Sequence, residues 1–223
     1  MKGRIAEIFE SIQGEGAFLG EQQIFVRFFG CNLNCSYCDT KLNSFQEYEP
    51  QELLGRIALF GNSCHSVAFT GGEPLLQKDF LKEVARLTVS RGYSNYLETN
   101  GTLYNELSDV LDYFDFIAMD IKLPSSGSAF GLWKAHRAFL EIAARKEVFL
   151  KCVISGDTSQ EDLRMASALV KEVAPTALVV LQPNSFEERV LVDKKLEQAR
   201  NVFGEFRISA CVIPQLHKIV GMR

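Results

Sequence analysis

The stretch QIFVRFFGCNLNCSYC, residues 23–38, is the part of the sequence that decides the fold. Its first half is mostly apolar, which is typical of a strand buried on both faces of a sheet. Gly30 ends this strand, and three cysteines in a CxxxCxxC spacing follow at once. The stretch therefore predicts a buried strand that leads directly into a loop of metal-ligating thiols.

Short apolar strands alternate with helical segments along the rest of the chain. Such alternation predicts βαβ units and a parallel sheet. About six units are present, fewer than the eight that close a full barrel. We therefore expect an α/β fold, a partial TIM-like (β/α)6 barrel with parallel strands, in which residues 1–223 form one domain. The expected strands cover residues 23–29, 66–69, 116–120, 148–154 and 177–181, with one leading to residue 97 and a short one at 206–208.

The composition is that of an ordinary soluble globular protein. The 24 Lys and Arg residues are outnumbered by 28 Asp and Glu residues, and the net charge of −4 gives no basic field for nucleic acid. No apolar run reaches the roughly 18 residues of a membrane helix, and the amino-terminal residues lack the apolar stretch of a signal peptide. We therefore expect a cytoplasmic protein with no membrane or nucleic-acid partner, whose cysteines are reduced thiols.

Cys31, Cys35 and Cys38 are the candidate metal ligands. Thiolates are the ligands of iron–sulfur clusters, and a four-iron cluster held by three cysteines leaves one iron open. An open iron can chelate the amino and carboxylate groups of a methionine derivative. Structural zinc is the alternative, because Cys64 or His65 could complete the four ligands that such zinc sites use. Chance clustering is a second alternative, and the spacing alone leaves all of these open.

The cysteine loop, with Tyr37 before its last cysteine, resembles the signature of the radical S-adenosylmethionine superfamily. TGGEP, residues 70–74, resembles the GGEP motif of the same superfamily. The resemblance implies a [4Fe-4S] cluster on the three cysteines, and S-adenosyl-L-methionine cleaved to a radical. Glycines permit close approach of the backbone, and the Glu73 carboxylate could accept a hydrogen bond from the methionine ammonium. On its own, the motif predicts only a tight turn into a helix.

Further stretches narrow the resemblance to one family. They are IFESIQGEG (residues 8–16), CDT (38–40), LETNGT (97–102), MDIK (119–122) and PQLHK (214–218). They resemble the 7-carboxy-7-deazaguanine synthases, and the similarity covers residues 9–218. The resemblance implies a carbon–nitrogen lyase that contracts the ring of 6-carboxy-5,6,7,8-tetrahydropterin to 7-carboxy-7-deazaguanine with loss of ammonia, in queuosine and 7-deazapurine biosynthesis. A 5′-deoxyadenosyl radical would abstract hydrogen from C6 of the pterin, and S-adenosylmethionine would be regenerated.

The same resemblance assigns a substrate-binding set. Ile12, Gln13 and Gly14 match the stretch that holds the pterin, and Thr70 would lie near it. The amide of Gln13 could both donate to and accept from a pterin edge. Arg27 stands alone in an apolar strand, and a buried guanidinium needs an anionic partner. The substrate carboxylate is the expected partner, and a structural carboxylate is the alternative.

The cofactor sites are carried over from the resemblance in the same way. Thr40 matches the Mg²⁺ position of the family, and its hydroxyl would need waters and substrate oxygens to complete the shell. No side chain is assigned a catalytic role, because the cluster and S-adenosylmethionine carry the radical chemistry. The roles of Glu98, Asn100 and His217 stay undetermined. The residues expected to bind S-adenosylmethionine are Tyr37, Cys38, Asp39, Gly72, Glu73, Asp120, Lys122, Gln182, Pro183 and Asn184.

The resemblance also implies partners. They are a pterin substrate, a low-potential electron donor such as flavodoxin or ferredoxin, and a second copy of the chain in a homodimer. Two other functions stay open. A glycyl-radical activase would share the cysteine loop but should lack QGEG, residues 13–16. A small zinc-binding module would need a fourth ligand and no S-adenosylmethionine.

Overall fold

A nine-stranded sheet organises the computed structural model, which describes residues 1–40, 42–128 and 131–221. Its strands are β1 (Gly3–Ile12), β2 (Gln22–Phe28), β3 (Gln46–Tyr48), β4 (Ser66–Gly71), β5 (Asn95–Thr99), β6 (Phe116–Asp120), β7 (Glu147–Ile154), β8 (Val179–Pro183) and β9 (Ala210–Val212). They lie across the sheet in the order β3-β1-β2-β4-β5-β6-β7-β8-β9. Neighbours from β2 onward are parallel, whereas β1 pairs antiparallel with β2 and β3.

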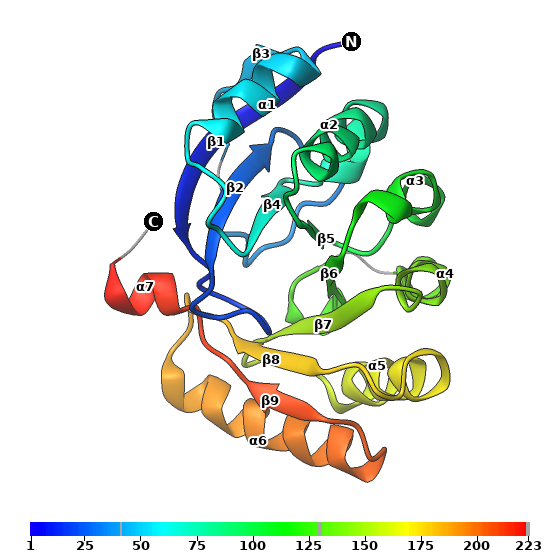
Figure 1. Ribbon diagram of the computed structural model, residues 1–223. Helices are drawn as coiled ribbons and strands as arrows, with labels where there is room; N and C mark the ends of the chain where they lie inside the picture. The colour runs from blue at the N-terminus through cyan, green and yellow to red at the C-terminus, as the bar shows by residue number, and fades with distance from the viewer. Residues whose placement is uncertain (41, 129–130, 222–223) are drawn as a thin grey trace.

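Helices connect the parallel strands and cover one face of the sheet. They are α1 (Pro50–Ala58), α2 (Lys78–Ser90), α3 (Tyr104–Val110), α4 (Trp133–Ala143), α5 (Gln160–Val173), α6 (Arg189–Glu205) and the short α7 (Leu216–Val220). Figure 1 shows α2 to α6 along the outside of the curved sheet and α7 on the opposite, open side. Within the described residues, no helix is long and apolar enough to cross a membrane.

The parallel part of the sheet forms an open barrel. Strand–helix units run from β2 and α1 to β8 and α6, and the sheet ends at the edges β3 and β9 without closing. This arrangement confirms the expected partial (β/α)6 barrel. The last parallel strand, β9, lies beyond the expected residues 206–208. Arg207 has a φ of 56°, a left-handed conformation that a regular strand does not contain.

The strands β1 and β3 are not predicted by the sequence pattern. Residues 6–9 of β1 are all only partly buried, so the alternation that marks a half-buried antiparallel strand is weak. The register between β1 and β2 also shifts between Ile5 and Glu7, which interrupts the pattern of the two faces. β1 nevertheless extends the barrel wall beyond β2, and it leads into the connection of residues 13–21.

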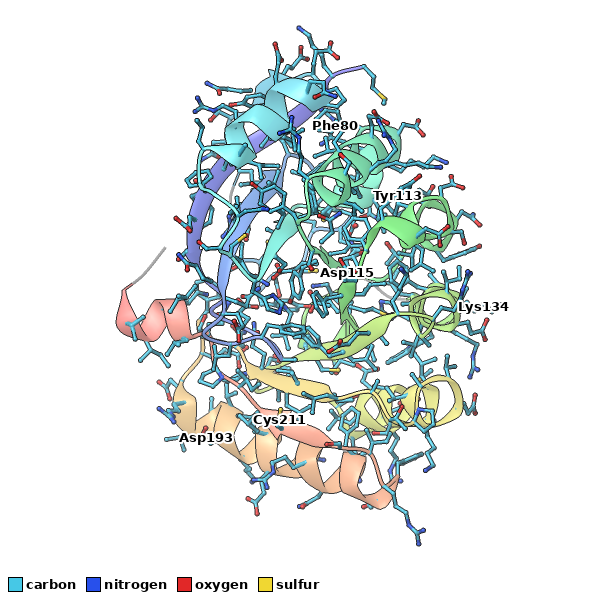
Figure 2. All side chains as sticks on the ribbon, viewed as in Figure 1. Phe80, Tyr113, Asp115, Lys134, Asp193 and Cys211 are labelled. Carbon is cyan, nitrogen blue, oxygen red and sulfur yellow. The ribbon has the colours of Figure 1, made fainter. Side chains whose placement is uncertain are left out.

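Apolar side chains fill both faces of the parallel sheet. The main core lies between the sheet and the helices and includes the fully buried rings of Phe28, Phe69 and Phe139. Figure 2 shows side chains filling this layer, with the exposed Lys134 pointing outward from α4. Burial on both faces explains why the parallel strands have nearly continuous apolar sequences.

A second group of apolar side chains lies inside the curve of the barrel. We call it the aromatic cluster, and its rings are those of Phe18, Phe25, Tyr96, Phe116 and Phe149. Phe18, from the connection between β1 and β2, lies 4.8 Å from Phe116, 5.8 Å from Tyr96 and 6.1 Å from Phe149, measured between ring centres. Phe116 is the first residue of β6, so the cluster fills the end of the barrel at which strands begin.

Candidate active site

A cavity of about 640 Å³ opens at the end of the barrel at which the parallel strands finish. This edge is where parallel α/β folds carry their ligand sites. Glu98 and Asn100 line the cavity, and Glu73 does not. The side chain of His217 lies outside the described residues. The predicted site residues that the cavity brings together are Ile12, Gln13, Gly14, Arg27, Cys31, Cys35, Tyr37, Cys38, Asp39, Thr40, Thr70, Gly72, Asp120, Lys122, Gln182, Pro183 and Asn184.

The three cysteines of the loop are free thiols that line the cavity. Asn100 Nδ2 donates to Asn32 Oδ1 at 2.8 Å and lies 3.9 Å from Cys31 Sγ, so β5 fixes the start of the loop. Burial raises the pKa of both Cys31 and Cys35, and the nearby Lys122 ammonium opposes that rise. A cubane cluster takes one thiolate on each of three irons, and separate, unpaired thiols facing one cavity fit that donor set.

The geometry also tests the four-ligand zinc alternative. Cys64 and His65 precede Ser66, the first residue of β4, whereas the cysteine loop lies beside the other end of that strand. A strand of this length spans roughly 20 Å, because each residue advances about 3.3 Å. His65 packs instead against Phe18 and Phe116, with ring centres 4.8 and 5.0 Å away. Neither residue therefore supplies a fourth ligand to the loop.

The two glycines of the GGEP turn allow the turn and the cysteine loop to touch backbone to backbone. Gly72 N donates to Phe28 O at 3.0 Å, and a Cβ on Gly72 would lie 2.0 Å from Gly30 O. Gly71 has a φ of 121°, and a Cβ there would lie 2.4 Å from Phe28 O. Glycine is the residue that permits both the φ value and this approach. The turn thus sets one wall of the cavity.

Glu73 follows the two glycines and is the predicted acceptor for the methionine ammonium. Its side chain is fully buried behind the cavity wall. The carboxylate accepts from Asn100 N at 2.8 Å, from the Thr99 hydroxyl at 3.0 Å and from Leu75 N at 3.2 Å. Burial raises the pKa of Glu73 to about 7, although these donors oppose the rise. Glu73 therefore ties the end of β4 to the end of β5.

The expected cofactor side of the cavity combines a buried ion pair with an unpaired acceptor. Lys122 Nζ lies 2.7 Å from Asp120 Oδ2 and 5.5 Å from the centre of the Tyr37 ring. Gln182 Oε1 is buried and has no hydrogen-bond partner among the described residues. A buried acceptor without a donor is costly. A ligand that donates an N–H at the end of β8 would satisfy it.

The expected substrate side is held by side-chain amides and carboxylates. Gln13 is buried, and its Nε2 donates to Gln23 Oε1 at 3.0 Å and to Glu98 Oε1 at 2.9 Å. Thr70 Oγ1 donates to Glu98 Oε2 at 2.5 Å. Glu98 therefore holds both Gln13 and Thr70 from β5. Sequence reasoning left the role of Glu98 open, and its place between two predicted residues now supplies one.

Arg27 has a structural carboxylate as its partner, one of the two that the sequence left open. Its Nε lies 3.2 Å from Glu7 Oε2, so a structural carboxylate is present on β1. Its guanidinium also lies 5.4 Å from the centre of the Phe9 ring. Arg27 is only partly buried and lines the cavity, so it remains in reach of an anionic ligand. The ion pair with Glu7 removes the cost of placing the charge in the sheet.

The loop end and the carboxyl-terminal tail meet at the mouth of the cavity. Thr40 Oγ1 lies 3.3 Å from Asp39 Oδ1. Gln215 Nε2 donates to Asp39 Oδ2 at 2.9 Å, and Lys218 Nζ lies 2.7 Å from the same oxygen. Although burial opposes the charge, Lys218 and Gln215 lower the pKa of Asp39 to about 2. The tail therefore holds the end of the cysteine loop.

Among the polar residues of the cavity, Glu15, Lys151 and Gln215 were assigned no role from the sequence. Lys151 Nζ lies 2.8 Å from Glu15 Oε2, and Gln215 Nε2 donates to Glu15 Oε1 at 2.7 Å. A usable signal existed for Lys151, because it stands alone in the apolar strand of residues 148–154 just as Arg27 does in β2. Glu15 and Gln215 lie inside the stretches 8–16 and 214–218 that carry the family resemblance, but those stretches did not show that the two side chains meet.

An open (β/α)6 barrel with three free thiols at its ligand edge defines the class of radical S-adenosylmethionine proteins. The sequence model of the Radical SAM superfamily matches residues 25–138. The 7-carboxy-7-deazaguanine synthase of Geobacter sulfurreducens is 33% identical and covers 97% of this chain and 96% of its own length. That of Archaeoglobus fulgidus is 35% identical and covers 100% of both chains. This chain belongs to the Radical SAM superfamily and, within it, to the 7-carboxy-7-deazaguanine synthase family.

The solved structures show the same fold. The crystal structure of QueE from Escherichia coli superposes with a TM-score of 0.64 at 22% identity, over 95% of this chain and 93% of that chain. The structure of TYW1 with a lysine-pyruvate adduct bound gives a TM-score of 0.60 at 17% identity, over 81% of this chain and 72% of that chain. The partial barrel is therefore shared with proteins of distant sequence.

Proposed function

We propose that this protein converts 6-carboxy-5,6,7,8-tetrahydropterin to 7-carboxy-7-deazaguanine by a radical ring contraction with loss of ammonia. The reaction makes it a carbon–nitrogen lyase of queuosine and 7-deazapurine biosynthesis. The observation that carries the proposal is the cavity, in which three free thiols face a wall of pterin-compatible polar groups across the barrel mouth. Full-length similarity to 7-carboxy-7-deazaguanine synthases supports the same substrate.

Cys31, Cys35 and Cys38 would hold the [4Fe-4S] cluster. When bound, the cluster and S-adenosylmethionine supply the radical that opens the reaction. Gly72 leaves the backbone bare beside the cysteine loop, which suits close approach of an amino acid moiety. Gln182 offers an unpaired acceptor that fits the amino group of an adenine, and Pro183 and Asn184 continue the same edge. The Asp120–Lys122 pair and Tyr37 complete this side.

The pterin would lie on the other side of the cavity. Arg27 would bind the substrate carboxylate, since it is the cation on β2 that lines the cavity. Glu98 holds both Gln13 and Thr70, and these two residues would orient the pterin ring. Ile12 and Gly14, which flank Gln13 in the sequence, would contact the ring as well. Each of these polar groups is fixed before the substrate arrives, which reduces the cost of ordering it on binding.

Thr40 would contribute one oxygen to Mg²⁺ at the mouth of the cavity. A single hydroxyl is a weak ligand, so substrate oxygens and waters would fill the remaining positions. Asp39, next to Thr40, keeps its charge through Lys218 and Gln215, and this fixed carboxylate supports a cation nearby. The test is to measure activity as a function of Mg²⁺ concentration. In Thr40→Val, the activity should no longer depend on the Mg²⁺ concentration.

We propose the cytoplasm as the compartment, because free thiols persist in a reducing environment. A flavodoxin or ferredoxin would supply the electron, and no nucleic acid would bind a chain of net charge −4.

A homodimer of this single domain is supported by an exposed apolar surface. Phe186, Val190 and Leu191 are 64%, 80% and 58% exposed, and Lys218 of α7 lies over the Phe186 ring. Sedimentation velocity measures the oligomeric state.

One anaerobic experiment tests the function. The cluster is reconstituted, and reductant, S-adenosylmethionine and 6-carboxy-5,6,7,8-tetrahydropterin are added. Formation of a deazapurine chromophore with release of ammonia is the expected result. Deoxyadenosine without deazapurine would favour a glycyl-radical activase, and a colourless protein with stoichiometric zinc would exclude both enzymes.

A further inference from the structure

A chain of polar contacts runs along the cavity, and both of its ends lie in the cysteine loop. We call it the polar ring, and its members in order are Tyr37, Lys122, Asp120, Lys151, Glu15, Gln215 and Asp39. The first arc belongs to the expected cofactor side, from Tyr37 through Lys122 to Asp120. The second arc belongs to the expected pterin side, from Glu15 through Gln215 back to Asp39. Residues far apart in the sequence thus share one network.

Lys151 joins the two arcs. Its Nζ lies 2.8 Å from Glu15 Oε2 and 3.5 Å from Asp120 Oδ1. Glu15 belongs to the connection that carries Gln13, and Glu15 N donates to Gln13 Oε1 at 3.1 Å. Asp120 ends β6 beside the cysteine loop. One ammonium group therefore holds a wall of each side of the cavity.

The charged states of Lys151, Glu15 and Asp120 stabilise one another. Only 15% of the Lys151 side chain is exposed, and 18% of each of Glu15 and Asp120. Burial opposes charge on all three groups, yet the two carboxylates raise the pKa of Lys151, and Lys151 lowers the pKa of Glu15. Without the ammonium, two buried carboxylates would face each other without a shared partner, and removal of one member of such a group is strongly destabilising locally.

We propose that Lys151 is a positioning residue that couples pterin binding to S-adenosylmethionine binding. The inference rests on the proposed function and deepens it. A ligand bound beside Asp120 would fix the side chain of Asp120. Because Lys151 pairs with both Asp120 and Glu15, it would then fix Glu15 and the Gln13 amide that Glu15 contacts. The gain for the second ligand is a coupling free energy, and such couplings commonly correspond to factors of about 5 to 150 in affinity.

Equilibrium binding tests the proposal without turnover. Calorimetry on the anaerobic holoenzyme, with no reductant, measures 6-carboxy-5,6,7,8-tetrahydropterin binding with and without S-adenosylmethionine. We expect S-adenosylmethionine to tighten pterin binding by the wild type about tenfold or more. In Lys151→Met this gain should disappear, so that the pterin affinities measured with and without S-adenosylmethionine become equal, whatever the change in the affinity without S-adenosylmethionine. Lys151→Arg keeps the charge and should keep most of the gain.

Lys195→Met is the matched control. Lys195 is a partly buried lysine of α6 whose Nζ donates to Thr158 O at 2.8 Å, outside the cavity. It should behave as the wild type in both titrations. A second readout is added under reducing conditions, where Lys151→Met should release more 5′-deoxyadenosine per deazapurine than the wild type. A general loss of stability would not produce that uncoupling in a protein that still melts cooperatively.

The possible outcomes separate the two proposals. If Lys151→Met keeps the gain and the wild-type ratio of 5′-deoxyadenosine to deazapurine, the coupling role is wrong even though the enzyme makes deazapurine. If the wild type makes no deazapurine, the proposed function itself fails. Should Lys151→Met not fold, Glu15→Gln decides, because it removes the charge at the pterin side while keeping the size of the side chain. An unchanged gain in Glu15→Gln would also overturn the coupling role.

Discussion

The two ends of the barrel interior differ in polarity: one is lined by apolar rings and the other by polar side chains. At the end where the strands begin, the aromatic cluster packs rings against rings, with Phe18 at its centre. At the end where the strands finish, the polar ring, three free thiols and the unpaired Gln182 line one cavity. One end is satisfied by its own contacts, and the other holds groups that a ligand would satisfy. The difference separates the part of the interior that stabilises the fold from the part that binds.

The largest effect should come from the thiol end. Cys35→Ala removes one of the three cluster ligands, and a cubane held by two cysteines should not persist. We expect loss of the brown colour and of all detectable turnover, with an unchanged thermal melting midpoint of the protein without its cluster. Iron analysis and visible absorption after anaerobic reconstitution measure the first result, and calorimetry measures the second. Retained colour and turnover would show that the ligand assignment is wrong.

The aromatic end should show the opposite profile. Phe149→Ala removes a buried ring from the aromatic cluster, and such changes cost about 3–5 kcal/mol in the free energy of unfolding. The cysteine loop keeps its contacts, so folded protein should still take up the cluster. Urea denaturation measures the loss of stability. Leu59→Ala is the control, since that residue is 74% exposed and the change should alter the free energy by about 0.5 kcal/mol or less.

Glu73 lies behind the cavity wall at the thiol end, and its stability contribution should depend on pH. Its pKa is about 7 in the folded protein, above its ordinary value of 4.5, because of burial. The folded state therefore binds the proton more tightly, so its contribution to stability is complete below about pH 4.5 and falls as the pH rises to 7. The loss is of the order of 3 kcal/mol at most.

Glu73→Gln removes this titration and serves as the reference. Urea denaturation from pH 4.5 to 7.5 should show the wild type losing stability relative to Glu73→Gln as the pH rises. Since every other titrating group is common to both proteins, the difference isolates Glu73. Curves that stay parallel over this range would contradict the raised pKa.

The smallest effect is expected for Cys64. It precedes β4, at the far end of the strand from the cysteine loop, and is only partly buried. Cys64→Ala should leave the iron content and the colour of the reconstituted protein unchanged, with a stability change of about 1 kcal/mol or less. A loss of metal in this variant would revive the four-ligand zinc alternative. The variant also serves as the matched cysteine control for Cys35→Ala.

The sequence predicts the two ends of the barrel unequally. The buried strands, their parallel order and the cysteine loop follow from local patterns, because burial on both faces leaves continuous apolar runs. The strand β1 is not predicted, since its residues 6–9 are only half-buried and its register with β2 shifts between Ile5 and Glu7. The burial pattern of β1 is set by its irregular pairing with β2. A regular alternation of apolar and polar residues is therefore missing from its sequence.

The site shows the same division. Short motifs predict Cys31, Gly72 and Glu73 as site residues; Cys31 and Gly72 line the cavity, whereas the side chain of Glu73 is buried. Its side-chain direction depends on Thr99 and Asn100, which offer donors behind the wall. Gln215 lies in the PQLHK stretch, but its role is not predicted, because its partners on the cysteine loop and at Glu15 come together only in the folded chain.

The contact between Gln215 and Glu15 joins residues 200 positions apart, and this separation sets the order of events as the chain folds. Contacts of such range form late, because the loop they close must first be shortened by the barrel itself. We expect the tail to dock after the barrel has formed, because its contacts need Glu15 and Asp39 to be in place already. A tail that docks last would leave the three cysteines accessible to iron and sulfide until the barrel is complete.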